Sequence, residues 1–485
     1  MELTTEPVRV PGPRGVRASA RAMRALLSEP CGALDALVAT HGRVVGLAVG
    51  PARLVVVGDA DLVGEVLAAP AERFRWRTAF RTLTIVTGPT AMMVSDGDDH
   101  RRRRRLAQPA FARRRLAAWA PLVVREVDRA IDDLPVGEPA DLHEAMRAVV
   151  RRVVVRVLFG ESLAGRADAI GAALAPAIAY AGSPALRQLP HPLPVGARAA
   201  ARRARRRVDR LLDDEIARRR AASPTPGARA DGGPGRDGPD GDAAERGRRG
   251  DVLDALLAAA ADGGADDAEV RDQVVTLIAA GHDTTSAAIS WLLTEVLLRP
   301  DVLARLRAEA DAAGSAGDGS PDDDGPGQLD PERLPYADAV VQESLRLHPA
   351  GPIAPRWVVQ PLQLGPYAVP PRTALVWSPY LLGRDPDHWD GPMSFRPDRF
   401  LGTDGDGGPG ASDAYLPFGA GPRKCIGFAL AHLEMQLIAA RVAQRLDATP
   451  SFTAVPPAVG MVTSRPSGGV PVVVTERRPG GRGPA

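Results

Sequence analysis

Apolar residues recur at helical spacing over most of this 485-residue chain. Residues 268–299 form the longest segment of this kind, with apolar or small side chains at i, i+3 and i+4 spacing before Pro300. At about 1.5 Å per residue this helix would be on the order of 45 Å long, enough to cross a whole domain. Segments rich in alanine, leucine and arginine predict further helices at 102–134, 141–158 and 197–220.

Strand patterns are fewer and shorter than helix patterns. Runs rich in valine and other β-formers predict strands at 44–49, 54–57, 357–359 and 470–475. The fold class that we expect is therefore mainly α with small β-sheets (α+β).

Glycine, proline and aspartate gather in three segments, 222–251, 312–330 and 402–413. Such segments bury too little apolar surface to offset the entropy lost on ordering, so we expect flexible insertions there. The motifs described below lie on both sides of these segments. We therefore predict a single domain over residues 1–485, with insertions rather than linkers and a disordered tail at 478–485.

Charge and cysteine content exclude several classes of protein. Basic and acidic residues number 61 and 59, a net charge of +2, so no global field attracts nucleic acid. All basic residues but Lys424 are arginine. The two cysteines, Cys31 and Cys425, exclude a disulfide framework and indicate a reducing, cytoplasmic compartment. We see no signal peptide and no apolar stretch near the roughly 20 residues of a membrane span, so we expect no membrane anchor.

Cys425 lies in the segment FGAGPRKCIG, from Phe418 to Gly427, before an alanine- and leucine-rich helix. Its glycines allow close approach to a ligand, and a helix start with basic neighbours favours a thiolate. A buried structural cysteine is the plainer alternative, and a nucleophile would need a base such as His432. The filled pattern FxxGxRxCxG favours a third role, a single thiolate ligand to haem iron.

The second motif, AGHDTT at 280–285, lies in the middle of the long predicted helix. Gly281 and the paired threonines are poor helix formers, so we expect a local opening of the helix here. An acid beside a hydroxyl, Asp283 and Thr284, suits proton delivery into a dry pocket. The alternative is a solvated helix face that carries a stray aspartate.

Two arginine-containing motifs complete the set. Glu343 and Arg346 share a helix face at i, i+3, and Arg399 could extend that pair into a structural ion network. In the run from His100 to Arg105, His100 and Arg104 face one way, as two donors for a carboxylate would. We expect the other arginines to be solvated, and the near-zero net charge argues against nucleic-acid binding.

These four motifs, in this order, resemble the cytochrome P450 family of haem-thiolate monooxygenases from about residue 11 to 478. The resemblance implies the mainly helical P450 fold and heme b (iron protoporphyrin IX) as cofactor. It implies that Cys425 is the iron ligand and that Asp283 and Thr284 support proton delivery and oxygen activation. It assigns the remaining cofactor contacts to His100, Arg104, Arg356 and Arg423 on the haem propionates, and to Phe418 beside the thiolate loop.

The resemblance also implies an activity and partners. One oxygen atom from O2 would enter a lipophilic small molecule such as a terpenoid, a fatty acid or a polyketide. No flavin- or iron–sulfur-binding segment is present, so electrons would come from a ferredoxin or flavodoxin with its reductase. We expect an acidic partner to dock near Lys424, helped by arginines at 102–105 and 113–115, on a monomeric protein.

Substrate contacts are expected by family position in residues 74–94, 176–195, 273–284, 350–355 and 459–463. The apolar side chains expected there are Phe80, Ile85, Met92, Met93, Ile178, Ile278, Ile353, Met461 and Val462. Two other functions remain open. One is a haem-thiolate peroxygenase or isomerase-type enzyme, and the other is a non-catalytic haem or arginine-rich interaction protein.

Overall fold

The computed structural model describes residues 8–111, 117–184, 188, 195–222, 251–261, 264–314, 329–402 and 413–479. The predicted insertions fall almost wholly outside these ranges, as does most of the predicted tail. Residues 113–115, expected near a docking partner, also lie outside the described residues.

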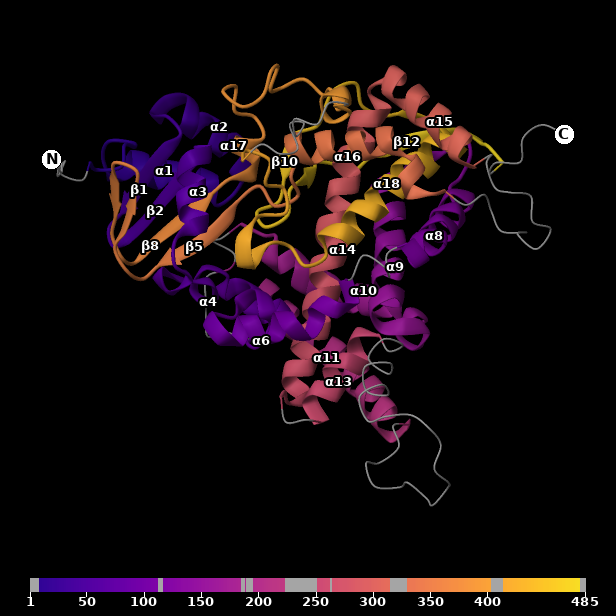
Figure 1. Cartoon of the computed structure of the whole chain (residues 1–485), viewed down its shortest axis with the longest axis horizontal. Coiled ribbons are helices and arrows are strands. Elements are labelled where there is room, and N and C mark those ends of the chain that lie inside the picture. Colours follow the sequence, from indigo (N-terminus) through magenta and orange to yellow (C-terminus); the bar gives the residue numbers. More distant parts are fainter. Residues whose placement is uncertain are drawn as a thin grey trace.

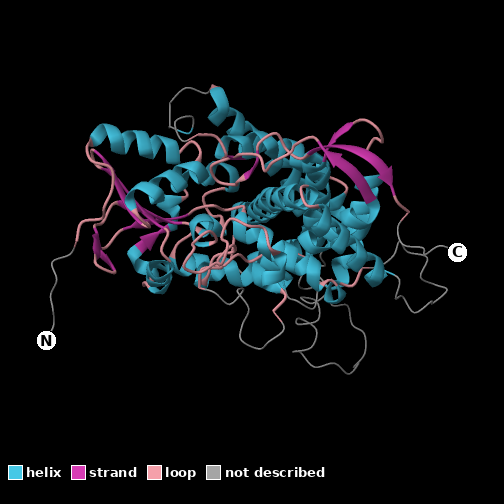
Figure 2. Cartoon of the chain, turned by 90° about the horizontal axis from the view of Figure 1, so that it is seen from above, coloured by secondary structure: helices cyan, strands magenta, loops and turns pink. Residues whose placement is uncertain are grey.

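Helices make up most of the molecule, and the strands gather toward two ends of the helical body (Figure 2). The longer helices are α1 (Val16–Leu26), α2 (Pro30–His41), α3 (Ala60–Ala68), α6 (Gly97–Ala107), α8 (Ala120–Asp132), α9 (Leu142–Ala164), α10 (Ala167–Ala181), α11 (Gly196–Ala222), α13 (Val252–Ala261), α14 (Asp267–Leu297), α15 (Pro300–Gly314), α16 (Pro335–Leu347) and α18 (Phe428–Arg445). Short helical turns are α4 (Trp76–Ala79), α5 (Thr84–Thr87) and α17 (Pro379–Leu382).

The strands form one five-stranded sheet and three smaller ones within the described residues. The five-stranded sheet has the order β1-β2-β8-β5-β3, in which only β2 and β8 run parallel, and the three-stranded sheet has the order β4-β12-β9. The strands are β1 (Val44–Val49), β2 (Ala52–Val57), β3 (Phe74–Arg75), β4 (Pro139–Asp141), β5 (Ala354–Val358), β6 (Leu362–Leu364), β7 (Tyr367–Val369), β8 (Thr373–Trp377), β9 (Leu446–Pro450), β10 (Ala458–Val459), β11 (Arg465–Pro466) and β12 (Pro471–Arg477). The predicted class, mainly α with small sheets, is confirmed.

One predicted helix was wrong in its extent. The segment 102–134 was expected to be continuous, but α6 ends at Ala107 and α8 begins only at Ala120. Pro109 explains the end of α6, because proline has no N–H to donate within a helix and its ring clashes with the carbonyl of the preceding turn. Pro121 then occupies the first turn of α8, a position where proline is well tolerated.

Helix α14 crosses the middle of the molecule (Figure 1) and is buried along most of its length. It packs against α9, α18 and α16, so it forms the centre of the largest hydrophobic core. At Gly281 a Cβ atom would lie 3.3 Å from Cγ1 of Val154, which leaves little space between α14 and α9. None of the helices in the described ranges is long and apolar enough to cross a bilayer.

The expected ion network is present around α16. Glu343 and Arg346 are fully buried and make two hydrogen bonds, with N–O distances of 2.7 and 2.8 Å. The Arg399 guanidinium donates to the same carboxylate over 3.1 Å. Arg346 also donates to the carbonyls of Pro392 and Ser394, so the network ties α16 to a loop fifty residues further along the chain.

Candidate active site

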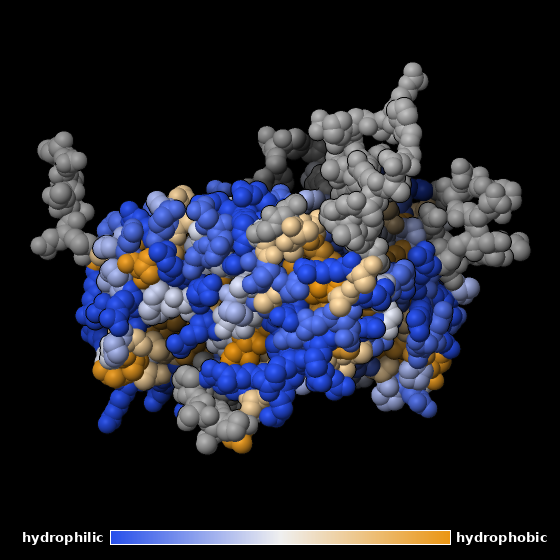
Figure 3. Space-filling model, turned by 90° about the horizontal axis from the view of Figure 1, so that it is seen from below, coloured by the Kyte–Doolittle hydropathy of each residue, from blue (hydrophilic) through white to orange (hydrophobic). Residues whose placement is uncertain are grey.

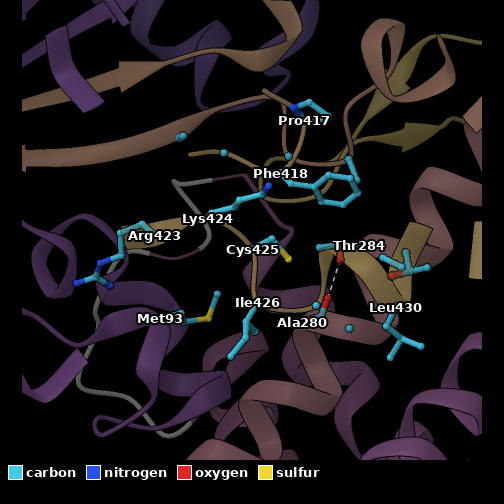
Figure 4. Close-up of a pocket in the computed structure, with 18 of the residues that line it drawn as sticks. Met93, Ala280, Thr284, Pro417, Phe418, Arg423, Lys424, Cys425, Ile426 and Leu430 are labelled. Carbon is cyan, nitrogen blue, oxygen red and sulfur yellow. Dashed lines mark hydrogen bonds between the residues drawn. The ribbon is translucent and has the colours of Figure 1, made fainter. Parts of the chain in front are cut away.

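A cavity of about 390 Å³ lies between α14 and the loop that precedes α18. All six residues expected to contact the cofactor line it, as does Thr284 from α14. They are His100, Arg104, Arg356, Phe418, Arg423 and Cys425. Figure 4 shows side chains of the loop and of α14 around this space. The structure thus brings together residues that are more than three hundred positions apart in the sequence.

The loop that carries Cys425 is a tight turn built on glycine. Gly419 and Gly421 have φ angles of 68° and 65°, in the left-handed region that other residues rarely adopt. The N–H of Cys425 donates to the carbonyl of Phe418 over 2.9 Å, which closes the turn. This geometry leaves the thiol at the wall of the cavity, one turn before α18 begins.

The surroundings of the Cys425 thiol act on its pKa in opposite directions. Burial raises the pKa, whereas the N–H of Gly427 and the charges of Arg104 and Lys424 lower it, and burial dominates. The Cys425 residue is exposed by surface area because the cavity beside it is open, yet it is surrounded by protein rather than by bulk water. A bound metal cation reverses this balance, because a coordinating thiol is deprotonated.

Three arginines at this cavity have no carboxylate partner. Arg104, Arg356 and Arg423 make no ion pair with any acid in the described ranges, although all three line the cavity. Arg356 and Arg423 lie over the ring of Trp76, with 5.0 and 4.0 Å from guanidinium carbon to ring centroid. Burial is the first cause that lowers the pKa of Arg356 and of Arg423 to about 10.

His100 is neutral at physiological pH in this setting. Burial, followed by the positive charges of Arg423, Arg104 and Arg101, lowers the pKa of His100 to about 3. A neutral imidazole can still donate one N–H, so His100 can bind a carboxylate oxygen without adding charge. The site therefore offers three cations, of which Arg356 is buried and Arg104 and Arg423 are half-buried, and a neutral donor to an anionic ligand with an apolar body.

The predicted proton-relay residues, Asp283 and Thr284, lie side by side but do not line the same set of cavities. Thr284 lines the main cavity and also a second cavity of about 450 Å³, whereas Asp283 lines only the second. Asp283 makes no hydrogen bond or ion pair with the residues that the structure describes. Thr284 thus lies between the two cavities, together with Met93 and Ala280, which also line both.

The expected opening of the helix at this motif was wrong. Helix α14 is continuous from Asp267 to Leu297. The Thr284 hydroxyl donates to the carbonyl of Ala280, with 2.6 Å between the oxygens (Figure 4). A hydroxyl that bonds to the carbonyl four residues earlier is satisfied within a regular helix, so no opening is needed.

The arginine run on α6 is less exposed than the sequence suggested. Arg102 donates to Glu269 of α14 over 2.8 Å, and the buried Arg103 pairs with the same carboxylate. The expectation that the arginines other than Arg104 are solvated was therefore wrong for these two. Arg105 remains exposed on α6.

Of the apolar side chains expected to contact substrate, most line one of the two cavities. Phe80, Met92, Met93 and Ile353 line the main cavity, while Ile178, Val462 and again Met93 line the second. Ile85, Ile278 and Met461 line neither cavity. Ile278 is instead buried in the core around α14, on a face of the helix that its sequence position could not specify.

Two residues at the cavity were missed by sequence reasoning. Trp76 supports both Arg356 and Arg423, and no spacing in the sequence links these three. Glu434 on α18 is only 1% exposed, and neither of its carboxylate oxygens has a hydrogen-bond partner in the described part of the chain. Burial raises the pKa of Glu434 well above its usual value. The sequence feature that could have identified Glu434 is that it is the only glutamate in α18, a largely apolar helix.

Comparisons with known proteins identify the family. A family model described as Cytochrome P450 matches residues 27–469, most of the chain. A putative cytochrome P450 139 from Mycobacterium tuberculosis is 31% identical over 416 residues, 85% of this chain and 90% of that protein. Cyclooctatin synthase from Streptomyces melanosporofaciens is 32% identical over 420 residues, 84% of this chain and 83% of that protein. The chain belongs to the cytochrome P450 family.

Two further similarities bear on activity and fold. Cyclooctat-9-en-7-ol 5-monooxygenase from Streptomyces melanosporofaciens is 32% identical over 412 residues, 84% of this chain and 82% of that protein. A retinoic acid-bound cyanobacterial CYP120A1 superposes with a TM-score of 0.78 at 22% identity, covering 97% of this chain and all of that one. The protein is a cytochrome P450 monooxygenase with this family's fold, and its cofactor is heme b.

The buried acid Glu434 generates a prediction about stability and pH. Folding raises the pKa of Glu434, so its neutral carboxyl contributes fully to the free energy of unfolding below the unfolded-state pKa of about 4.3. This contribution is lost as the pH rises through the pKa of Glu434 in the folded protein. Glutamine has nearly the same shape as glutamic acid but does not ionise. We expect the thermal midpoints of Glu434→Gln and the wild type to be similar near about pH 5, with the variant higher at about pH 9.

The control for this measurement is Glu138→Gln, because Glu138 is exposed. Its thermal midpoint should differ from that of the wild type by the same amount at both pH values. Parallel pH dependences of Glu434→Gln and the wild type would contradict the assignment of Glu434 as a buried neutral acid.

Proposed function

We propose that this protein inserts one oxygen atom from O2 into a lipophilic small molecule such as a terpenoid, a fatty acid or a polyketide. The observation that carries the proposal is the thiol of Cys425 in an apolar cavity edged by three arginines that pair with no acid in the described ranges. The relative named cyclooctat-9-en-7-ol 5-monooxygenase acts, by its name, on an unsaturated alcohol, which supports a lipophilic substrate here.

The residues at the cavity have separate roles in this proposal. Cys425 holds the haem iron as a thiolate. Arg104, Arg356 and Arg423 bind the haem propionates, which supply the carboxylates that these guanidiniums lack in the protein itself. His100 adds a neutral donor to the same groups, and Phe418 packs beside the thiolate loop, with its ring 6.2 Å from that of Phe428. One haem domain over residues 1–485 is sufficient for this site.

Protons reach the site through two residues of α14. Haem with a thiolate ligand supplies the oxygen-activating chemistry when it is bound. Asp283 lines only the second cavity, so it can exchange protons with water there. Thr284 lines both cavities, and the lone pairs of its hydroxyl can accept a hydrogen bond from water in either one. The carbonyl of Ala280 holds the Thr284 hydroxyl in position while this occurs.

Electrons come from a separate protein in this proposal, an acidic ferredoxin or flavodoxin with its reductase. Lys424 and Arg105 are exposed near the cavity and carry the positive charge that such a partner would meet. Arg102 and Arg103 do not contribute, since they pair with Glu269. We propose that the protein acts as a monomer in a reducing, cytoplasmic setting, which agrees with its two unpaired cysteines.

Replacement of the thiolate tests the central assignment. We expect Cys425→Ala to lose the strongly red-shifted absorption band that the reduced, CO-bound wild type shows. Cys31→Ala is the matched control, because Cys31 is buried 3.8 Å from the Ser464 hydroxyl and lies outside the cavity. If Cys425→Ala keeps the band, the proposed ligand is wrong.

The proton path is tested by the coupling of oxygen consumption to product. Thr284→Ala should lower the fraction of consumed O2 that appears in product by on the order of tenfold or more, because positioned proton transfer contributes at least that much. Thr276→Ala is the control, since its hydroxyl bonds to the carbonyl of Asp272 on the same helix and lines the same cavity. Equal coupling in the two variants would exclude the proposed role of Thr284.

Electrostatic docking of the electron donor predicts a salt dependence. Turnover with a ferredoxin should fall as ionic strength rises from about 0.01 M to about 0.15 M, since the Debye length shrinks from about 30 Å to about 8 Å. Lys424→Glu combined with Arg105→Glu should slow turnover at low salt, whereas Arg17→Glu on α1 should not. A rate that is independent of salt would contradict this docking surface.

A further inference from the structure

Helix α11 exposes a row of arginines that make no ion pair with the described part of the protein. Positions Ala201, Ala204, Val208 and Leu212 are buried, and the outward positions between them are arginine. We call the exposed set the α11 arginine stripe: Arg202, Arg203, Arg206, Arg207 and Arg210. None of these side chains pairs with an acid in the described ranges.

Two of the nearby acids on the same helix are already engaged. Asp209 accepts a hydrogen bond from the inward-facing Arg205 over 2.7 Å. Asp213 accepts one from Arg271 of α14, also over 2.7 Å. The α11 arginine stripe is therefore a local excess of positive charge on a protein whose net charge is only +2.

The placement of the stripe opposes the stability of the helix. The five arginines lie within residues 202–210 of α11, where the one acid, Asp209, pairs with the inward-facing Arg205. Arginines four residues apart, such as Arg202 and Arg206, also repel each other. The acids Asp213, Asp214 and Glu215 lie further toward the C-terminus. A surface that served stability alone would place acids four residues from these arginines, and the lack of such acids along most of the stripe points to a partner.

The helices beneath α11 border the second cavity. Helix α11 packs on α10 and α5, which supply Ile178, Ala179 and Val86 to its lining. The Nη1 of Arg205 donates to the carbonyl of Val86 over 3.1 Å, which joins α11 to α5 directly. The stripe thus lies on the outer side of the helices that cover this cavity.

The stripe also adjoins an exposed apolar residue. Val195, directly before α11, is 58% exposed. Helix α11 lies at the lower edge of the molecule in Figure 1, and Figure 3 views that side, where hydrophilic side chains surround apolar patches. A partner for this face should offer anions together with an apolar phase.

We propose that the α11 arginine stripe docks the protein reversibly on an anionic lipid surface. Lipid phosphates match the fork of guanidinium donors, and the layer beneath them accepts an apolar side chain such as Val195. A duplex nucleic acid also offers phosphates but no such apolar layer. Clustered basic residues without a second anchor give weak, salt-sensitive adsorption. Docking here places α10, α5 and the cavity that they line next to the phase in which lipophilic molecules dissolve.

The test uses the full-length haem-loaded protein in vesicle co-sedimentation. Binding should be measurable on vesicles of phosphatidylglycerol and phosphatidylcholine at low salt, and weak on phosphatidylcholine alone or in about 0.5 M salt. The variant R202Q/R206Q/R210Q should bind the anionic vesicles tenfold or more weakly. The matched control R17Q/R21Q/R24Q removes the same charge at similar spacing from exposed positions of α1, and it should bind within twofold of the wild type.

A second measurement separates lost docking from lost folding. The α11 triple variant should have a thermal midpoint equal to or higher than that of the wild type, because it removes repulsion between arginines four residues apart. Weaker binding with a raised or unchanged midpoint supports the proposal. Equal losses in the α11 and α1 variants would overturn it in favour of general charge adsorption.

A competition experiment addresses nucleic acid as the alternative partner. Stripe-dependent binding of a duplex DNA oligonucleotide that is tighter than binding to the vesicles would overturn the lipid proposal. The vesicle measurements need no substrate and no turnover. They can therefore fail while the monooxygenase proposal stands, and the reverse also holds.

Discussion

A fully buried ion pair, Glu343 with Arg346, connects the helical core to the loop that carries the reactive thiol. The guanidinium of Arg346 lies 5.1 Å from the ring centroid of Trp389, which in turn packs against Tyr415. The Tyr415 hydroxyl donates to the carbonyl of Gln342 on α16 over 3.2 Å, and the Cys425 loop follows directly along the chain. Breaking such a buried pair typically costs about 3–5 kcal/mol, because it leaves one charge without a partner. The position of the thiol therefore depends on an interaction well away from it.

The cavity shows the opposite arrangement of charge. Around Glu343 each buried charge has a partner within the protein, whereas Arg104, Arg356 and Arg423 have none in the described ranges. Removing a cation from water without a partner is costly, so one buried and two half-buried arginines at one edge of a cavity indicate that a bound anion completes the site. We propose that the carboxylates of heme b meet this need and that its apolar ring lies against the rest of the cavity wall. Binding of the cofactor would therefore stabilise the arrangement of these arginines around the cavity.

Predictions from the sequence were correct for features that depend on residues close together in the chain. They were wrong where a feature depends on contacts between residues far apart in the chain. The strand at 44–49 and the helix at 268–299 were found because apolar periodicity is a short-range property. The predicted helix at 102–134 was too long because Pro109 was given too little weight. The opening expected at Thr284 does not occur, since the Ala280 carbonyl satisfies the hydroxyl inside the helix. Arg102 and Arg103 are paired because Glu269, distant in sequence, lies opposite them.

The sequence by itself determined the class of fold, the family and the candidate residues, because turn glycines, a helix start and fixed spacings act over a few positions. It also determined that Cys425, rather than Cys31, lies in a loop suited to a ligand. Only the tertiary structure decided which arginines line a common cavity and that Trp76 supports two of them. It also decided that Asp283 lines one cavity whereas Thr284 lines both. It alone showed that Glu434 is buried without a hydrogen-bond partner among the residues that the structure describes. The physical reason is that burial and charge pairing arise between segments far apart in the chain, and no local pattern specifies which side chains will meet.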